Sequence, residues 1–374
     1  MNKMIRLSKC SLSSKEKRNV ISALNSNYLG MGKYVKTFEK MLSMYFKRPT
    51  ICVTNGTAAL QLSIQALNIK KGDEIIVPSL TYVSSFQSIS ANGVKPVACD
   101  VTLDNLSLDP KDVERKVTKK TKAIMPVHYS GDYGNTDLIY KIAKKYNLRI
   151  IEDAAHAFGS RYKNKKIGSF GDIVCFSFDG IKNITSGEGG CIVSNDKKVL
   201  NKIADLRLLG VSKDSSKRFK DQRSWEMDVK EQGWRYHMSN LMAAIGIEQL
   251  KRFPKLSSKR KKIAKYYDKL LKNEKEIQIF KRDYEQVVPH IYPIKIHSLK
   301  DNKKLRKILL KSNIQTGLHY FPNHLLSYYK KKNLVLKNTD KIYRKLLTLP
   351  LHPDISSKQV KYIVKKLNKS IQEI

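Results

Sequence analysis

Lys182 is the residue of this chain whose placement says most about chemistry. It lies within residues 175–190, in a glycine-bounded turn that directly follows an apolar run. A lysine amine held at the end of a buried strand is a nucleophile that forms Schiff bases with carbonyl compounds. The chain has 72 Lys and Arg residues, so this position taken alone also allows a second interpretation, a solvated surface lysine.

A second group of polar residues could hold a phosphate. Residues 54–59 follow an apolar run and open a helical pattern, and Gly56 lets the backbone turn tightly there. The amides of Thr57 and Ala58 would then lie at a helix N-terminus, which favours an anion. Ser177, at the end of another apolar run, can donate its hydroxyl to the same group. A helix N-cap with no ligand would give the same pattern at residues 54–59.

A third group could bind a flat aromatic ring. Asp153 ends an apolar run, where a carboxylate is costly unless it is paired, and it could hold a protonated ring nitrogen. His156 could face the same ligand, and Tyr82 follows a further apolar run and could stack on the ring. A helix N-cap at Asp153 and a core position for Tyr82 are the alternatives. With the amine and the phosphate group, these are the parts that pyridoxal phosphate (PLP) needs.

Apolar runs alternate with helical patterns over roughly the first 250 residues, and these elements must position the polar groups. Such an alternation is typical of an α/β fold, a mostly parallel sheet covered on both faces, with ligands beyond the carboxyl ends of the strands. The expected strands are 50–53, 74–77, 96–99, 123–127, 149–152, 173–178 and 190–193. Among the helices expected between them are 58–67 and 136–145.

The pattern changes near residue 250, which predicts a domain boundary. Pro254 and residues 257–258 predict a break in the helical pattern. The elements expected after it are a basic helix over 259–272, a strand over 287–296 and helices over 299–311 and 357–371. We therefore expect a large domain over residues 15–250 and a smaller C-terminal α+β domain over 251–374, with residues 1–14 packed against the smaller domain.

The net charge of +39 could attract nucleic acid, anionic membranes or anionic small molecules. The lysines are spread along the chain without interleaved aromatic residues, so we interpret most of this charge as compositional and expect no nucleic-acid partner. There is no apolar stretch of about 20 residues and no signal-peptide pattern, so we expect a cytoplasmic protein without a membrane span. The five scattered cysteines predict neither disulfides nor a metal site.

Several motifs together resemble one family, the sugar aminotransferases of the DegT/DnrJ/EryC1/StrS group. The similarity runs from roughly residue 5 to the end of the chain. The matching segments are 55–60, 78–82, 96–101, 124–128, 152–157, 176–190, 238–244, 316–320 and 349–352. The motif Phe-Ser-Phe-x-x-x-Lys-x-x-x-x-Gly-Glu-Gly-Gly around Lys182 is the most specific of them. The resemblance implies fold type I, with a seven-stranded, mostly parallel sheet, and PLP as cofactor.

The resemblance also implies roles for individual residues. Lys182 forms the Schiff base with PLP and moves the proton during catalysis, Asp153 pairs with the pyridine nitrogen, and His156 lies near the ring hydroxyl. The other residues expected at the cofactor are Gly56, Thr57, Ala58, Tyr82, Ser177 and Arg235. Those expected at the substrate are Glu188, His319 and Tyr320.

Arg235 is a departure from the family pattern. The family often reads Gly-x-Asn-Tyr-Arg-Met where this chain reads Gly-Trp-Arg-Tyr-His-Met at residues 233–238. The usual Asn reaches the cofactor phosphate of a neighbouring subunit, and an arginine at this place could make a stronger phosphate contact. The role of His237 stays open. The resemblance further implies a homodimer with active sites at the subunit interface.

These observations predict a PLP-dependent aminotransferase that moves an amino group from glutamate to a nucleotide-linked keto-sugar, with an NDP-4-keto-6-deoxyhexose favoured. The product would serve amino-sugar biosynthesis for a surface polysaccharide such as O-antigen lipopolysaccharide. One alternative is a PLP-dependent sugar dehydratase of the same family, in which histidine replaces the lysine, so Lys182 disfavours it. A non-catalytic nucleic-acid-binding regulator is the other alternative.

Overall fold

Seven short strands form the central sheet of the computed structural model, which describes residues 4–212, 214–223, 225, 227–300 and 302–373. Their order across the sheet is β1 (Thr50–Val53), β9 (Gly190–Ser194), β8 (Ile173–Ser177), β5 (Arg149–Asp153), β4 (Thr121–Ile124), β2 (Glu74–Pro78) and β3 (Lys95–Cys99). β9 runs antiparallel to both of its neighbours, and the other strands all point the same way. The predicted α/β fold with a mostly parallel seven-stranded sheet is confirmed.

Helices cover both faces of this sheet because its strands are apolar on both sides. Alternate residues of one strand belong to different cores: Ile75 packs in one, and Ile76 in another. The first face carries α3 (Gly56–Ala66), α4 (Val83–Ser90) and α7 (Lys197–Leu206). The opposite face carries α2 (Lys33–Phe46), α5 (Pro110–Lys116), α6 (Thr136–Lys145) and the start of α9 (Asn240–Leu271).

A second, antiparallel sheet follows in the C-terminal part of the chain. It consists of β10 (Ile277–Ile279), β11 (Tyr292–Ile296) and β12 (Leu346–Leu349), which we call the C-terminal sheet. Apolar residues of α9, α10 (Asn302–Lys311) and α12 (Ser357–Gln372) pack in a core with it. The N-terminal segment lies beside this unit, since Ile5 pairs with Ile314 and the Leu351 amide donates to the Leu7 carbonyl. The exact domain limits stay a prediction.

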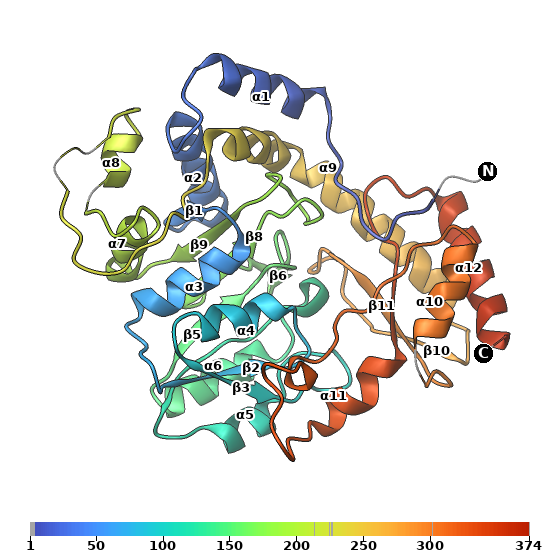
Figure 1. The fold of residues 1–374 in the computed structure, drawn as a ribbon. Coiled ribbons are helices and arrows are strands. Elements are labelled where there is room, and N and C mark those ends of the chain that lie inside the picture. Colours follow the sequence, from blue (N-terminus) through green and yellow to red (C-terminus); the bar gives the residue numbers. More distant parts are fainter. Residues whose placement is uncertain (1–3, 213, 224, 226, 301, 374) are drawn as a thin grey trace.

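The predicted break after residue 250 is wrong, because α9 continues as one helix of 32 residues through Pro254. Buried residues on both sides of the proline hold it: Phe253 and Leu256 near the break, and Ile263 further along. This packing outweighs the hydrogen bond that proline cannot make. In Figure 1, α9 extends from beside α2 to α12 and so connects the two sheets.

The strand predicted over 287–296 is shorter than expected, since only residues 292–296 form β11. Pro289 has no amide to donate to a strand neighbour. Val288 is instead held by side chains: its amide donates to Ser160 Oγ at 3.0 Å, and its carbonyl accepts from Asn183 Nδ2 at 3.3 Å. This buried, irregular segment leads directly to His290.

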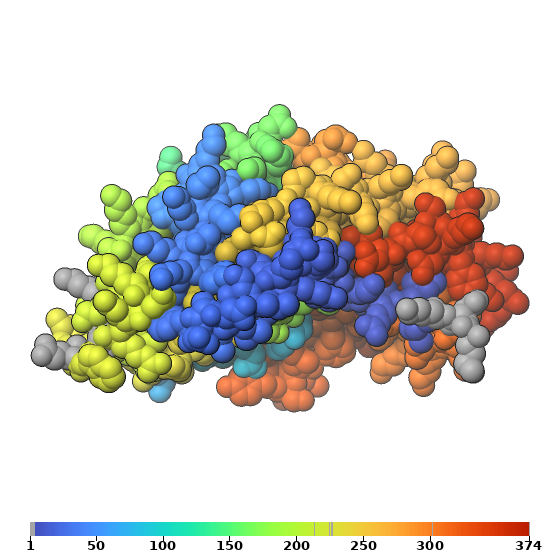
Figure 2. All heavy atoms as spheres, turned by 90° about the horizontal axis from the view of Figure 1, so that it is seen from above, coloured from blue at the N-terminus to red at the C-terminus, as the bar shows by residue number. Residues whose placement is uncertain are grey.

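The remaining elements lie around these layers. Among the described residues they are α1 (Ser14–Asn25), α8 (Asp214–Arg218), α11 (Lys337–Ile342), the hairpin of β6 (Arg161–Tyr162) with β7 (Lys165–Lys166), and short 3-10 helices at Tyr129–Gly131, Asn323–Leu325 and Tyr343–Lys345. Seen from above, the blue N-terminal helices lie between the yellow-green segment around α8 and the red C-terminal helices (Figure 2). Of the helices that the structure describes, none combines the length and apolar character that a membrane span requires.

Candidate active site

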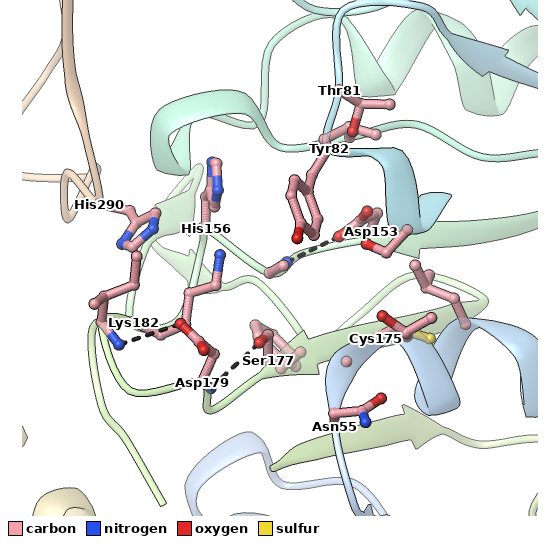
Figure 3. Close-up of a pocket in the computed structure, with 18 of the residues that line it drawn as sticks. Asn55, Thr81, Tyr82, Asp153, His156, Cys175, Ser177, Asp179, Lys182 and His290 are labelled. Atoms are coloured by element: carbon pink, nitrogen blue, oxygen red, sulfur yellow. Dashed lines mark hydrogen bonds between the residues drawn. The ribbon is translucent and has the colours of Figure 1, made fainter. Parts of the chain in front are cut away.

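A cavity of about 430 Å3 lies where the strands β5 and β8 end and α3 begins. Such a position beyond the carboxyl ends of the strands is where ligands bind in open α/β sheets. The structure brings most of the sequence-predicted site residues together in its wall: Gly56, Thr57, Tyr82, Asp153, His156, Ser177, Lys182, Glu188, His319 and Tyr320. In Figure 3, Lys182, His156 and His290 gather at one end of this pocket, away from Asn55 and Cys175.

Two of the predicted residues do not line this cavity. Ala58 is buried, and its amide donates to Asn55 Oδ1 at 2.8 Å, which caps α3. Arg235 is exposed and lines a separate groove with Arg218 and Trp225. Both residues therefore lack contact with the cavity of their own chain, and their roles stay predictions.

Lys182 lies in the turn after β8, and its amide donates to the Asp179 carbonyl at 3.0 Å. Burial lowers the pKa of its amine to about 8, although the carboxylates of Asp153 and Asp179 act in the opposite direction. An amine with a pKa near neutrality is partly unprotonated at physiological pH, so it can attack an aldehyde and accept a proton. This geometry favours the active-site interpretation of Lys182 over the surface interpretation.

The N-terminus of α3 meets Ser177 closely enough to form a phosphate cradle. A Cβ on Gly56 would lie 2.9 Å from the Ser177 Cβ, so only glycine permits this approach. Ser177 Oγ accepts from the Asp179 amide at 3.3 Å, which leaves its own proton available to donate. Helix amides with an adjacent hydroxyl donor suit a phosphate.

Gly56→Ala should weaken PLP binding on the order of tenfold, because the added methyl group must displace Ser177 or the start of α3. Titrating the apo protein with PLP and following the absorbance measures the dissociation constant. Gly30→Ala is the matched control, since a Cβ at Gly30 meets nothing within 4 Å. Equal affinities for the two variants would contradict the assignment of the cradle.

Asp153 and its neighbour Glu152 point to opposite faces of β5, which explains how two adjacent carboxylates are tolerated. Glu152 is buried and bonds His128 Nε2 and Tyr140 Oη, each at 2.7 Å. Asp153 lines the cavity and accepts from Ser85 Oγ at 2.8 Å and from the Ala155 amide at 3.2 Å. Residues 154–159 contain no helix, so the N-cap alternative for Asp153 is wrong.

His156 and Tyr320 form a hydrogen-bonded pair in the wall of the cavity. The Ser130 amide donates to His156 Nδ1 at 3.3 Å, so Nε2 carries the ring proton and donates to Tyr320 Oη at 2.8 Å. Burial, together with the nearby Lys182 charge, lowers the pKa of His156 well below its usual value and keeps the ring neutral. The phenol proton of Tyr320 is then free to be donated into the cavity.

Two further histidines line the same end of the cavity. His290 is buried, and its ring lies 4.4 Å from that of His156, centroid to centroid. Burial lowers the pKa of His290 well below its usual value and that of His319 to about 4. The histidines around Lys182 therefore stay neutral and add no positive charge beside the amine.

Tyr82 and Glu188 lie at the open side of the cavity. Tyr82 is 59% exposed, and its ring is tilted at 50° to that of Tyr320, with 5.9 Å between the centroids. An exposed ring at the mouth of a pocket can stack on a bound cofactor, and this exposure excludes the core alternative for Tyr82. Burial and the nearby Asp179 raise the pKa of Glu188.

Sequence reasoning missed several residues of this site, among them Asp179 and His290 in the wall of the cavity and Ser85, which bonds Asp153. Ser85 and Asp179 lie within a few residues of motifs that were recognised, so closer reading of those segments could have found them. His290 lies near no recognised motif. It is far from His156 in the sequence, and only the folded chain brings the two rings into contact.

The donor set fits PLP. A glycine-dependent cradle accommodates the phosphate, Asp153 offers a carboxylate to the ring nitrogen, and the Lys182 amine can reach an aldehyde. Within the part of the chain that the structure describes, no group of three His, Cys, Asp or Glu side chains is arranged to hold a metal ion. The fold and this pocket define a PLP-dependent aminotransferase of fold type I.

The chain belongs to the DegT/DnrJ/EryC1/StrS aminotransferase family, whose profile matches residues 11–368. It is 36% identical to GDP-perosamine synthase of Escherichia coli O157:H7, over 96% of each protein. Its structure is similar to that of Helicobacter pylori PseC, an aminotransferase involved in pseudoaminic acid biosynthesis, with a TM-score of 0.92, 28% identity and full coverage of both chains. The PLP form of Streptococcus pneumoniae Spr1654 gives a TM-score of 0.90 at 29% identity over 99% of each chain.

Proposed function

We propose that this sugar aminotransferase transfers the amino group of glutamate to a nucleotide-linked keto-sugar, with an NDP-4-keto-6-deoxyhexose as the favoured acceptor. The reaction yields 2-oxoglutarate and an amino sugar, which we place in surface-polysaccharide biosynthesis. The observation that carries the proposal is the Lys182 amine in one cavity with Asp153. The nucleotide named in GDP-perosamine synthase favours a nucleotide-linked acceptor. A cytoplasmic location stays an expectation from the sequence.

The residues of the cavity divide the work of such a transfer. Bound PLP would supply an aldehyde carbon that takes up the amino group and later gives it to the acceptor, and a ring that withdraws electrons. Lys182 Nζ, with a pKa of about 8, can take a proton from the substrate carbon and return it. Asp153 would keep the ring nitrogen of bound PLP protonated, and the His156–Tyr320 pair presents a hydroxyl donor to the cavity.

A second subunit would complete the site. Lys182 is the one Lys or Arg among the described residues that line the cavity. The phosphates of PLP and of a nucleotide-linked sugar would both favour additional cations nearby. Arg235 is exposed on its own chain, next to a groove whose rim includes Trp225, 85% exposed, and Met227, 62% exposed. Such exposed apolar side chains favour an interface between two copies, in which Arg235 reaches the partner's cofactor phosphate.

Mixing two inactive variants should restore activity if Arg235 acts across the interface. Lys182→Ala and Arg235→Ala each leave every homodimer with damaged sites, whereas a heterodimer has one intact site. Random pairing of equal amounts then gives roughly a quarter of the wild-type turnover per subunit. Turnover of each variant alone and of the co-expressed mixture tests this. No recovery in the mixture, or full activity of Arg235→Ala alone, would contradict a role in trans.

The substrate assignment is tested by incubating the PLP-loaded protein with glutamate and a panel of nucleotide-linked keto-sugars. Mass spectrometry should detect an amino sugar nucleotide, and an equal amount of 2-oxoglutarate should appear. The panel distinguishes amination at C3 from C4 and dTDP, UDP and GDP from one another. A product that has lost a hydroxyl group without gaining nitrogen would instead indicate the dehydratase.

A further inference from the structure

Arg260, in the middle of α9, has a guanidinium that is buried without an acid partner among the residues the structure describes. Its side chain is 1% exposed. Its Nη1 donates to the carbonyls of His290 at 3.1 Å and Leu351 at 3.2 Å, and its Nη2 donates to the carbonyl of Ile181 at 3.3 Å. Burial lowers the pKa of this arginine to about 10, and no carboxylate offsets that effect.

These three carbonyls belong to segments that are far apart in the sequence. Ile181 directly precedes Lys182, His290 lines the cavity, and Leu351 follows β12 of the C-terminal sheet. One planar guanidinium therefore fastens the turn that carries the amine to the unit built around the C-terminal sheet. Burying a charge without a carboxylate partner is costly, so the presence of an arginine at this position calls for an explanation.

We infer that Arg260 is a positioning residue for Lys182: it fixes the backbone beside the lysine and places a permanent positive charge within electrostatic reach of the amine. The inference rests on the role proposed for Lys182. Arginine suits this purpose because its guanidinium keeps its charge when buried and can hold several carbonyls at once.

The charged and titratable groups around Lys182 determine the expected sign. Asp153 and Asp179 raise the pKa of the amine, whereas burial and the Arg260 charge lower it. The neighbouring rings of His156, His290 and His319 are neutral, because burial lowers the pKa of each. Without the Arg260 charge, the pKa of Lys182 rises, and a higher pH is needed to obtain the same fraction of neutral amine.

Amine labelling of the apo protein tests the inference and requires neither cofactor nor turnover. A failure of the inference is therefore distinguishable from a failure of the proposed function. Trace acetic anhydride is applied between pH 5 and 10, and the peptide carrying Lys182 is quantified by mass spectrometry. In Arg260→Met, labelling of Lys182 at pH 7 should fall about three- to tenfold relative to the unaltered protein, and the profile should move to higher pH. Arg260→Lys should give a smaller shift than Arg260→Met, because a buried ammonium can keep part of the charge but loses its proton more readily than a guanidinium.

Hydrogen exchange tests the anchoring of the turn. Both Arg260→Met and Arg260→Lys should show faster exchange of the backbone around residues 181–183, because methionine has no donor and a compact ammonium cannot reproduce the planar fork of the guanidinium. Arg48→Met is the matched control: Arg48 is also buried and donates to four carbonyls, those of residues 168 and 170–172. The Arg48→Met variant should be less stable than the unaltered protein, but labelling of Lys182 and hydrogen exchange around residues 181–183 should not change.

The outcomes separate the inference from a merely structural role. An unchanged Lys182 labelling profile in folded Arg260→Met overturns it, and so does an equal shift in Arg48→Met. If Arg260→Met does not fold, Arg260→Gln makes the same test, since it removes the charge but retains an amide donor.

Discussion

Lys182→Ala is expected to lower turnover by at least about a thousandfold while the protein stays folded. The variant removes the amine that we propose both attaches to the cofactor aldehyde and moves the substrate proton, and general acid–base catalysis alone contributes about 100- to 10,000-fold. The phosphate cradle at Gly56 and Ser177 remains, so PLP should still bind. Release of 2-oxoglutarate from glutamate with the accepted keto-sugar measures the loss.

Two additional measurements make this result specific. Borohydride should fix PLP covalently to the unaltered protein and leave it removable from Lys182→Ala, and added methylamine should restore part of the activity. Lys197→Ala, which removes an exposed lysine at the start of α7, is the control and should retain full turnover. Turnover of Lys182→Ala within tenfold of the unaltered protein would exclude this lysine as the catalytic amine.

The sheet and most of its site could be predicted from sequence because both depend on local patterns. Strand β1 and helix α6 have the bounds expected from their apolar runs and helical period. A residue such as Asp153 is recognisable because a carboxylate ends a buried strand, and the carboxyl ends of parallel strands lie along one edge of the sheet.

The features that could not be predicted depend on contacts between distant segments. Pro254 is a helix breaker by local chemistry, yet the packing of Phe253 and Leu256 keeps α9 continuous. Arg260 resembles the other basic residues of its segment, and only the fold buries it beneath Lys182. In a chain with 72 Lys and Arg residues, the sequence does not distinguish a buried cation such as Arg260 from the many exposed ones.

Asp153→Asn is expected to lower kcat by about 100- to 1,000-fold, the usual consequence of removing one well-placed electrostatic contact in an active site. In the role that we propose, the carboxylate stabilises a protonated ring nitrogen, which asparagine cannot do, so the ring of the variant should withdraw electrons less strongly. The asparagine oxygen can still accept from the Ala155 amide, and its NH2 group can donate to Ser85 Oγ in place of the bond that the second carboxylate oxygen accepts, so the fold should be retained. The measurement is kcat at saturating PLP and glutamate.

Glu152→Gln is the matched control, because it neutralises the adjacent carboxylate on the opposite face of the same strand. Glu152 bonds the buried His128 and Tyr140, so its loss should lower Tm. Turnover of the folded protein should stay close to normal, since Glu152 does not line the cavity. A similar loss of kcat in both variants would mean that Asp153 acts through the stability of β5; a loss confined to Asp153→Asn places its effect on the cofactor ring.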